Sequence, residues 1–529
     1  MPDAPPAASA ARFGSLTRAD RLALLLSLLA VLLAYLVTDR VFERLPHIED
    51  EVAYVWQARA TAMGRLTLPS PPQPKSFLVP FVVDYLGQRF GKYPPGWPAL
   101  LGIGVLLGVR WLVNPLLAGL GVWFTYRLGK RLSSETTGLL AALLTVTSPF
   151  FLMNSGSLLS HPFGLVLSLG FVLAWLDAWD IPAVNPRPPS TAAPWMPTLA
   201  AALCLGMLAL TRPLTAIGVG LPFAFHGLYL LIKRDWQTRR RLVVFCLIVL
   251  ALVSLQFAWQ FAATGNPLLN PYTLWWKYDK IGFGPGVGRL SAGHTLDQAK
   301  VNTIFSLKVG AHDLSGWGPY SWIFMPFGLL AILRYRLWRA VLPVLVFPSL
   351  VLVYLAYWIG SWLFGPRYYY EGLFSLTLLS AMGIALLAGW PVQPSQAWQR
   401  YTGWLRLRPL LVTAVLLLLL SANLLFYAPL RVGGMQGLYN ASRSRLAPFL
   451  EPETQEMAPA LVIVHPDHWN EYAVLTDLQD LRLDTPFIFV ISRGPSTDRN
   501  VAAAFPQRQV IHYYPSDPYT FYLGVPRDD

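Results

Sequence analysis

Long apolar runs constrain the fold of this sequence more than any other feature. Leu22 to Val37, Leu242 to Phe257 and Leu410 to Leu425 contain no charged residue. With their flanks they reach the roughly 20 residues that a helix needs to cross about 30 Å of hydrocarbon. Hydrophobic residues make up 54% of the chain and charged residues only 13%. The sequence therefore predicts a polytopic membrane protein, and because no small-residue cleavage pattern follows the first run, we expect that run to be retained as a span.

The apolar segments predict an all-α transmembrane bundle of about eleven helices. The expected spans are 21–38, 110–127, 136–152, 158–178, 195–211, 213–232, 242–262, 319–334, 338–359, 368–389 and 409–429.

The basic residues predict the orientation of this bundle. The net charge is +13, but Lys and Arg cluster in short loops instead of forming one stripe, which argues against a nucleic-acid partner. A cytoplasmic N-terminus places most of the basic loops on one face, as the positive-inside rule requires. We therefore expect a multi-pass protein of the plasma (inner) membrane with an extracytoplasmic C-terminus. The basic residues placed inside are Arg12, Arg18, Arg21, Arg127, Lys130, Arg131, Lys233, Arg234, Arg239, Arg240, Arg241, Arg334, Arg336, Arg339, Arg400, Arg406 and Arg408.

The longest connections all fall on the outer face. They are residues 39–109, residues 263–318 and the chain after about residue 430. The predicted organisation is a cytoplasmic tail (1–20), a transmembrane domain (21–430) and an extracytoplasmic C-terminal domain (431–529). Because binding and catalysis concentrate on long loops, we expect the active surface on this face.

Local patterns predict the structure of these outer segments. Residues 50–63 have the composition of a helix along the membrane surface, and residues 98–107 predict a short interfacial or re-entrant helix. After the last span, the β-prone runs 461–464 and 487–491 predict strands of a small α/β or β-rich domain.

Three adjacent acids, Glu49, Asp50 and Glu51, follow the first span by a few residues. Neighbouring carboxylates raise one another's pKa, so such a cluster is expected where a metal, a substrate cation or proton transfer offsets the repulsion. Acids in the first turn of a solvated helix also complement its dipole, and position alone leaves both interpretations open.

Two short motifs resemble the GT-C glycosyltransferases, particularly the branch of the lipid A aminoarabinose transferases and protein O-mannosyltransferases. One is Asp50-Glu51 followed by Tyr54, and the other is Lys92-Tyr93-Pro94-Pro95, which resembles the family's Lys-Pro-Pro element with Tyr93 inserted. The resemblance covers roughly residues 20–430 and implies a transfer from a polyprenyl-phosphate sugar. It places the base that activates the acceptor on Asp50, with Glu51 supporting it or helping to hold a metal.

The leaving phosphate of such a donor needs cations. Lys92 carries over from the family's motif, and Arg367 opens the tenth expected span beside Tyr368 and Glu371. Interfacial anchoring by lysine and an aromatic belt are the alternatives. Arg212, in the tight turn between two expected spans, could meet phosphate or cap helix ends.

The remaining candidates are ligands of the substrate or of a metal. His161 begins the fourth expected span where many family members carry an acid, so a divalent metal ion held with Asp50 is the one cofactor left open; a hydrogen-bonded structural histidine is the alternative. In the 263–318 loop, Trp275 and His294 lie among rings and glycines typical of a sugar platform, although such rings also anchor loops. Tyr54, Tyr93, Tyr368 and Glu371 complete the predicted substrate contacts.

The sequence thus favours a membrane glycosyltransferase that moves a hexosyl or pentosyl group from a polyprenyl-phosphate donor to an extracytoplasmic acceptor, which is a protein, a lipid or a glycan. A multi-pass transporter or flippase of a lipid or lipid-linked sugar is the alternative, because buried ionisable groups and many spans suit that class equally well. A scaffold without activity would not be expected to carry clustered acids and cations.

Overall fold

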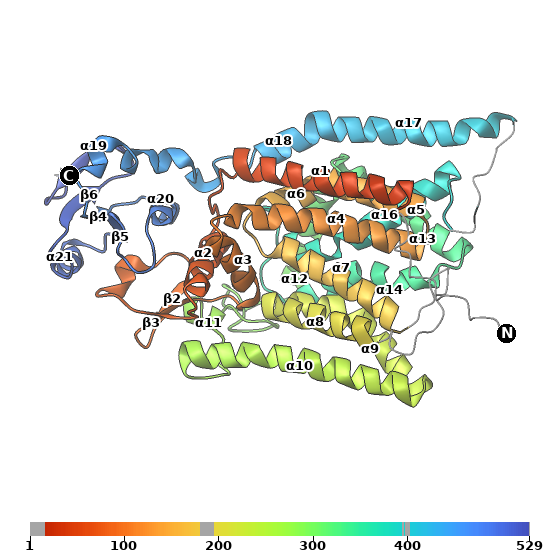
Figure 1. Cartoon of the computed structure of the whole chain (residues 1–529), viewed down its shortest axis with the longest axis horizontal. Helices are drawn as coiled ribbons and strands as arrows, with labels where there is room; N and C mark the ends of the chain where they lie inside the picture. The colour runs from red at the N-terminus through yellow and green to blue at the C-terminus, as the bar shows by residue number, and fades with distance from the viewer. Residues whose placement is uncertain (1–15, 180–194, 394–395, 397–402, 528–529) are drawn as a thin grey trace, which may run out of the picture.

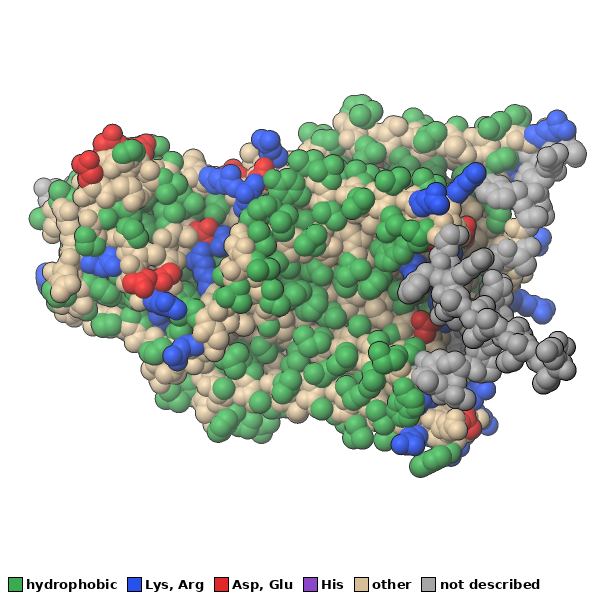
Figure 2. Space-filling model, in the orientation of Figure 1, with side chains coloured by type: hydrophobic (Ala, Val, Ile, Leu, Met, Phe, Trp, Pro, Cys, Tyr) green, Lys and Arg blue, Asp and Glu red, His purple; other side chains and the backbone are tan. Residues whose placement is uncertain are grey.

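The protein consists of an elongated helical bundle and a smaller α/β lobe at one end of it (Figure 1). The computed structural model describes residues 16–179, 195–393, 396 and 403–527. The first helix of the bundle begins at the end remote from the lobe, and the described chain ends in the lobe (Figure 1). Apolar side chains cover the visible face of the bundle, as expected of a surface in contact with lipid (Figure 2).

The bundle is built from helices whose ends carry recognisable signals. Thr17 and Asp20 form a capping box at the start of the first helix, and Asp235 caps the longest one. The bundle helices are α1 (Arg18–Arg40), α4 (Val113–Leu132), α5 (Glu135–Val146), α6 (Pro149–Gly156), α7 (His161–Ala178), α8 (Trp195–Thr211), α9 (Pro213–Lys233), α10 (Trp236–Thr264), α13 (Met325–Arg334), α14 (Val341–Val344), α15 (Val346–Tyr354), α16 (Leu373–Ala388), α17 (Leu407–Ala422) and α18 (Ala428–Gly433).

The expected count of eleven spans is not confirmed. Within the described ranges, six helices are long and apolar enough to cross a membrane, or seven if the bent pair α5 and α6 forms one span. That pair bends by 61° where Ser148 precedes Pro149, because proline disfavours helical geometry in the residue before it. The expected span 338–359 ends early at Tyr354, and α8 has only 17 residues.

Between the bundle and the lobe lie the outer loop elements. These are α2 (Glu49–Ala62), β1 (Leu68–Pro69), β2 (Val82–Tyr85), β3 (Gln88–Gly91), α3 (Gly96–Leu106), α11 (Tyr272–Trp275) and α12 (Leu296–Asp313). Strands β2 and β3 form a hairpin whose turn, Leu86-Gly87, has positive φ at both residues, as a two-residue type I′ turn requires. Lys92 directly follows β3, the second strand of this hairpin.

Helix α2 is the element shared by both parts of the molecule. Tyr54 and Ala58 pack in the core of the bundle, whereas Val52, Trp56 and Ala60 pack in the core of the lobe. Residues 50–63 are therefore helical as predicted, but the helix is buried on two faces instead of lying on a membrane surface. The short helix expected at 98–107 is α3.

The C-terminal lobe is a small α/β unit. Its sheet has the strand order β5-β4-β6-β7, with β4 parallel to β5 and β6, and β7 antiparallel to β6. The two predicted strands are β4 and β5. Its elements are α19 (Pro452–Gln455), β4 (Ala460–Val464), α20 (Trp469–Leu475), β5 (Phe487–Ile491), α21 (Pro495–Ala503), β6 (Gln509–Tyr513) and β7 (Phe521–Leu523).

Phe449 forms the centre of the lobe's core. It is fully buried, and its ring lies 4.8 Å from the rings of Phe489 and Tyr513 and 5.5 Å from that of Phe521. Aromatic clusters of this kind contribute through burial and edge-to-face packing.

We expect Phe449→Ala to lower the free energy of unfolding of the lobe by about 3–5 kcal/mol, because the substitution leaves a cavity in a packed core. Hydrogen exchange of the β4 and β6 amides would measure the effect. Leu523→Ala is the matched control, since that side chain is 53% exposed. Equal exchange in the two variants would contradict the assignment of this core.

Candidate active site

Asp50 lies in the first turn of α2, at the junction of the bundle and the outer loops. Its Oδ2 accepts a hydrogen bond from Nη2 of Arg367 at 3.2 Å, and its Oδ1 accepts one from the Tyr93 hydroxyl at 2.5 Å. Burial alone would raise the pKa of Asp50, but the Arg367 guanidinium, the Tyr93 hydroxyl and the charge of Lys92 hold it below its usual value. Asp50 is therefore a carboxylate at neutral pH.

Arg367 opens the 3-10 turn η5 (Arg367–Gly372), which precedes α16. Its Nη1 is buried and has no hydrogen-bond partner among the described residues. A buried guanidinium nitrogen without an acceptor is costly, so this atom is available for an anionic oxygen.

Lys92 reaches the same region from the end of β3. Its Nζ pairs with Asp279 at 3.2 Å and lies 3.6 Å from the centre of the Phe81 ring. Burial lowers the pKa of Lys92, and the charges of Asp279 and Asp50 oppose that effect. The inserted Tyr93 does not displace the lysine from the site, because its own ring packs at a tilt against that of Tyr54, with centroids 4.4 Å apart.

A second charged group lies at the outer ends of α7, α8 and α16. Glu371 is fully buried, and its Oε1 lies 3.1 Å from Nε of Arg212 and 3.2 Å from Nδ1 of His161. Gly164, one turn into α7, leaves room for this carboxylate, since a Cβ there would approach it to 2.6 Å. The predicted residues Arg212, Glu371 and His161 therefore form one connected group.

Ser160 and the tyrosines link the two charged groups. The Ser160 hydroxyl lies 3.2 Å from the Tyr54 hydroxyl and accepts from Nη1 of Arg212 at 3.3 Å. Nη2 of Arg212 donates to Tyr354, on whose ring Tyr368 stacks at 5.0 Å. Arg212 thus already has partners on three nitrogens, unlike Arg367.

Glu51 has a different environment from Asp50. Its Oε2 accepts from the backbone N–H groups of His47 and Ile48, and its Oε1 accepts from that of Leu158 at 2.7 Å. Burial raises the pKa of Glu51, and the three N–H groups oppose that rise. These bonds cap α2 and tie it to the loop before α7, so the geometry favours a positioning role over the predicted support of the base or of a metal.

The other predicted residues lie at the edges of the cluster. Trp275 reaches it through Phe81, whose ring centroid lies 5.6 Å away. His294 binds the carbonyl of Leu355 at 2.9 Å and stacks on Phe283, so it closes the 263–318 loop and stands outside the connected cluster; its role as a substrate ligand stays a prediction. Glu49, the first acid of the cluster, is half-buried, and burial raises its pKa.

Sequence reasoning missed Asp279 and several aromatic rings outside the 263–318 loop. Asp279 is 3% exposed and accepts hydrogen bonds from Lys92, Tyr357 and Trp358. An acid inside an aromatic stretch of an outer loop was the available signal. The missed rings are Phe81, Tyr354 and Tyr357, which lie within contact range of predicted residues, and Trp358, which donates to Asp279.

The donor set fits an anion better than a metal ion. Both Asp50 oxygens already accept hydrogen bonds, and the contact of His161 is with Glu371 in a group that includes an arginine. Within the described ranges, no three His, Cys, Asp or Glu side chains lie together where they could hold a metal ion. No step of the reaction is therefore assigned to a metal ion. The binding of such an ion by His161 together with Asp50 stays a prediction.

Solved structures share this architecture. ArnT from Cupriavidus metallidurans bound to undecaprenyl phosphate matches with a TM-score of 0.56 and 14% identity, covering 92% of each chain. The chain has the GT-C fold. The archaeal oligosaccharyltransferase AglB from Archaeoglobus fulgidus, in complex with an inhibitory peptide and a dolichol-phosphate, matches with a TM-score of 0.52 and 10% identity over 93% of this chain and 69% of that one.

A further structure of the Archaeoglobus fulgidus oligosaccharyltransferase, in complex with Zn and sulfate, matches with a TM-score of 0.50 and 12% identity over 91% of this chain and 67% of that one. No protein-family model matches the sequence, and neither does any curated protein. The likeness is thus one of fold: a mostly helical chain with several apolar helices and a small β-containing C-terminal lobe.

We expect Glu51→Gln to lower the free energy of unfolding by about 1–3 kcal/mol, because an amide nitrogen would face a buried N–H group that now has an acceptor. Thermal unfolding of the purified chain would measure the loss. Glu49→Gln, two residues earlier on α2 and only half-buried, is the control and should change stability less. If the control loses as much, the capping role of Glu51 is wrong.

Proposed function

We propose that this protein transfers a sugar from a polyprenyl-phosphate donor to an acceptor on the extracytoplasmic face of the plasma (inner) membrane. The observation that carries the proposal is the ion pair of Asp50 with Arg367, whose second terminal nitrogen is buried and has no partner in the described part of the chain. A carboxylate that can accept a proton thus lies beside a guanidinium that can donate hydrogen bonds to a phosphate. The binding of undecaprenyl phosphate by ArnT and of dolichol-phosphate by AglB, which share the fold, supports this class of donor.

The reaction divides the site into two roles. An acceptor hydroxyl attacks the anomeric carbon, the bond from that carbon to the phosphate oxygen breaks, and the electron pair leaves with polyprenyl phosphate. Asp50 takes the proton of the attacking hydroxyl. Arg367 and Lys92 stabilise the charge on the leaving phosphate. Arg212 is connected to this part of the site by hydrogen bonds through Ser160 to Tyr54. Because attack and departure are in line, the anomeric configuration inverts.

Donor binding would also activate the base. A phosphate that takes up the charge of Arg367 weakens the interaction that now lowers the pKa of Asp50. Asp50 then becomes a better proton acceptor at the moment when the donor is in place. The aromatic rings of the 263–318 loop, including Trp275, supply apolar faces for the sugar.

The position of the charged cluster favours a transferase over a transporter. The cluster is built from α2, the loop after β3 and the helix ends Ser160, Arg212 and Arg367, not from residues in the middle of spans. The basic last turns of α4 and α9 lie at the opposite end of the bundle, which supports a cytoplasmic N-terminus (Figure 1).

We expect Asp50→Asn to lower the rate of transfer by about 10²–10⁴-fold, the usual contribution of a general base. The assay gives the purified chain radiolabelled polyprenyl-phosphate sugars with candidate protein, lipid and glycan acceptors. Asp467→Asn, at an exposed position of the lobe, is the control. Undiminished transfer by Asp50→Asn would remove the residue from catalysis, and movement of lipid-linked sugar across liposomes without release of polyprenyl phosphate would favour a transporter.

The pH profile provides an independent test of the site. Asp50 has a lowered pKa in the free enzyme, so kcat/KM should hold across the neutral range and fall only as the pH drops through that lowered value. Tyr93→Phe removes one hydrogen bond that lowers this pKa, so the acid limb should move to higher pH. Tyr519→Phe, on an exposed ring of the lobe, should leave the limb in place. An unmoved limb in Tyr93→Phe would show that Asp50 is not the group titrating there.

A further inference from the structure

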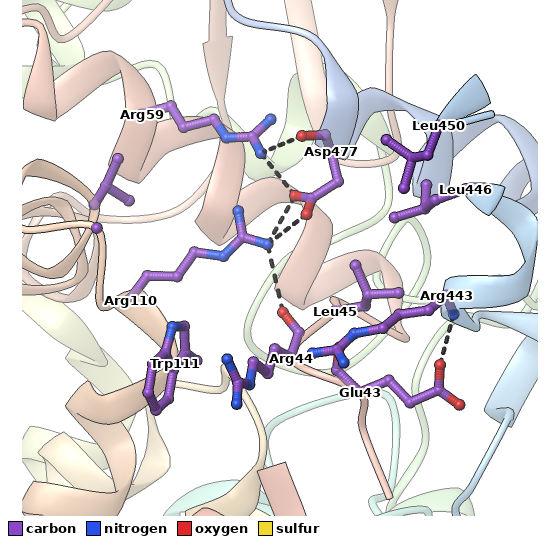
Figure 3. A pocket seen from close by; sticks show the side chains of 12 residues that line it. Glu43, Arg44, Leu45, Arg59, Arg110, Trp111, Arg443, Leu446, Leu450 and Asp477 are labelled. Atoms are coloured by element: carbon purple, nitrogen blue, oxygen red, sulfur yellow. Dashed lines mark hydrogen bonds and ion pairs between the residues drawn. The ribbon is translucent and has the colours of Figure 1, made fainter. Parts of the chain in front are cut away.

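A separate cavity of about 500 Å³ lies where the outer end of α1 and the turn η2 (Arg110–Leu112) meet the C-terminal lobe (Figure 3). It lies beside the end of α2 that is remote from Asp50. Arg59, which lines it, is nine residues beyond Asp50, or about 14 Å along the helix. The cavity is lined by Glu43, Arg44, Leu45, Arg59, Val105, Gly108, Arg110, Trp111, Arg443, Leu446, Leu450 and Asp477.

Exposed apolar side chains border the cavity. Leu106 and Leu107, at the end of α3 beside it, are 67% and 69% exposed, and Leu450 on the lobe is 60% exposed. Apolar side chains this exposed next to a transmembrane bundle are expected to lie in the lipid interface. Trp111, a residue type enriched in that zone, forms one wall.

The lining carries an excess of positive charge, with four arginines against two acids. Asp477 pairs with Arg59 at 2.6 Å and with Arg110 at 2.7 Å, and these bonds hold the lobe to the bundle. Arg44 and Arg443 are more open, with side chains 33% and 53% exposed, and they share one acid, Asp39, which lies 2.7 Å from Nε of Arg44 and 4.0 Å from Nη2 of Arg443. Figure 2 shows basic side chains gathered in the notch between the lobe and the bundle.

The backbone at the cavity is strained. Glu43 and Arg44 both have positive φ, 50° and 62°, which is unfavourable for residues with a Cβ. The turn places the Arg44 guanidinium 4.2 Å from the centre of the Trp111 ring and lets Glu43 accept from the backbone N–H of Arg443 at 2.6 Å. Such strain persists where surrounding contacts impose it, and it clusters at ligand sites.

We propose that this cavity binds the phosphate group of an anionic lipid of the outer leaflet, with Arg44 and Arg443 as its principal ligands. Guanidinium groups bind phosphate through charge-assisted hydrogen bonds, and the neighbouring exposed leucines accept the start of the acyl chains. This goes beyond the proposed transfer reaction, because the cavity and Asp50 belong to opposite ends of α2. The lipid would bridge the bundle and the lobe on the side where Asp477 joins them.

Native mass spectrometry of the full chain in detergent micelles tests the proposal with phosphatidylglycerol and phosphatidylcholine of the same acyl chains. The unmodified protein should retain phosphatidylglycerol preferentially. The double variant Arg44→Gln, Arg443→Gln should bind it at least about tenfold more weakly, since each charge-assisted bond contributes about a factor of ten or more. Arg499→Gln, on an exposed arginine of α21, should bind like the unmodified protein.

Inorganic phosphate, added as a competitor, distinguishes the source of the ligand. Displacement of phosphatidylglycerol by it supports recognition of phosphate alone, and resistance to displacement together with loss in the double variant supports recognition of the lipid form. Equal binding of both lipids, or equal binding by the double variant and the unmodified protein, would overturn the proposal. Sugar transfer by the double variant is measured in parallel, so failure of the lipid site is distinguished from failure of the proposed function.

Discussion

The structure depends on the pairing of carboxylates buried at the start of α2. Two adjacent acids cannot both be taken out of water without partners, because the desolvation of a charge costs several kcal/mol. The chain solves this in two ways. Arg367 and Tyr93 satisfy Asp50, whereas backbone N–H groups satisfy Glu51. Arg367, more than 300 positions after Asp50 in the chain, thereby contacts the first turn of α2.

This pairing requires that α2 itself be held firmly, and two cores do so. One face, through Tyr54 and Ala58, belongs to the bundle, and the other, through Val52 and Trp56, belongs to the lobe. Arg59 extends the second contact by its ion pair with Asp477. The C-terminal lobe is thus part of the support of the site, because without it the outer face of α2 would be exposed apolar surface.

The sequence predicted the features that depend on local pattern. Apolar runs predicted the membrane class, β-prone runs predicted β4 and β5, and two short motifs predicted the GT-C fold together with Asp50 and Lys92. Ionisable residues at the ends of expected spans predicted Arg212, Arg367 and Glu371. The span count was not confirmed because prolines such as Pro149 divide apolar segments that look continuous in composition. Asp279 was missed because its partner Lys92 is 187 residues away in the chain, a pairing that no local pattern records. The two neighbours Asp50 and Glu51 look alike in sequence. Their environments differ because Arg367 and Tyr93 contact Asp50, whereas the backbone N–H groups of His47, Ile48 and Leu158 contact Glu51.

The proposed chemistry follows from one feature of the Asp50 and Arg367 pair. An ion pair that is complete before the substrate arrives would be a poor base and a poor phosphate ligand, since each partner already satisfies the other. Arg367 differs because no residue that the structure describes provides an acceptor for its Nη1, so a phosphate can bind there before the contact with Asp50 is given up. As the phosphate charge grows during bond breaking, the guanidinium is drawn toward it and its hold on the carboxylate weakens. Asp50 therefore becomes a stronger base at the stage when the leaving phosphate needs the charge of Arg367. This one side chain couples proton removal from the acceptor to departure of the phosphate.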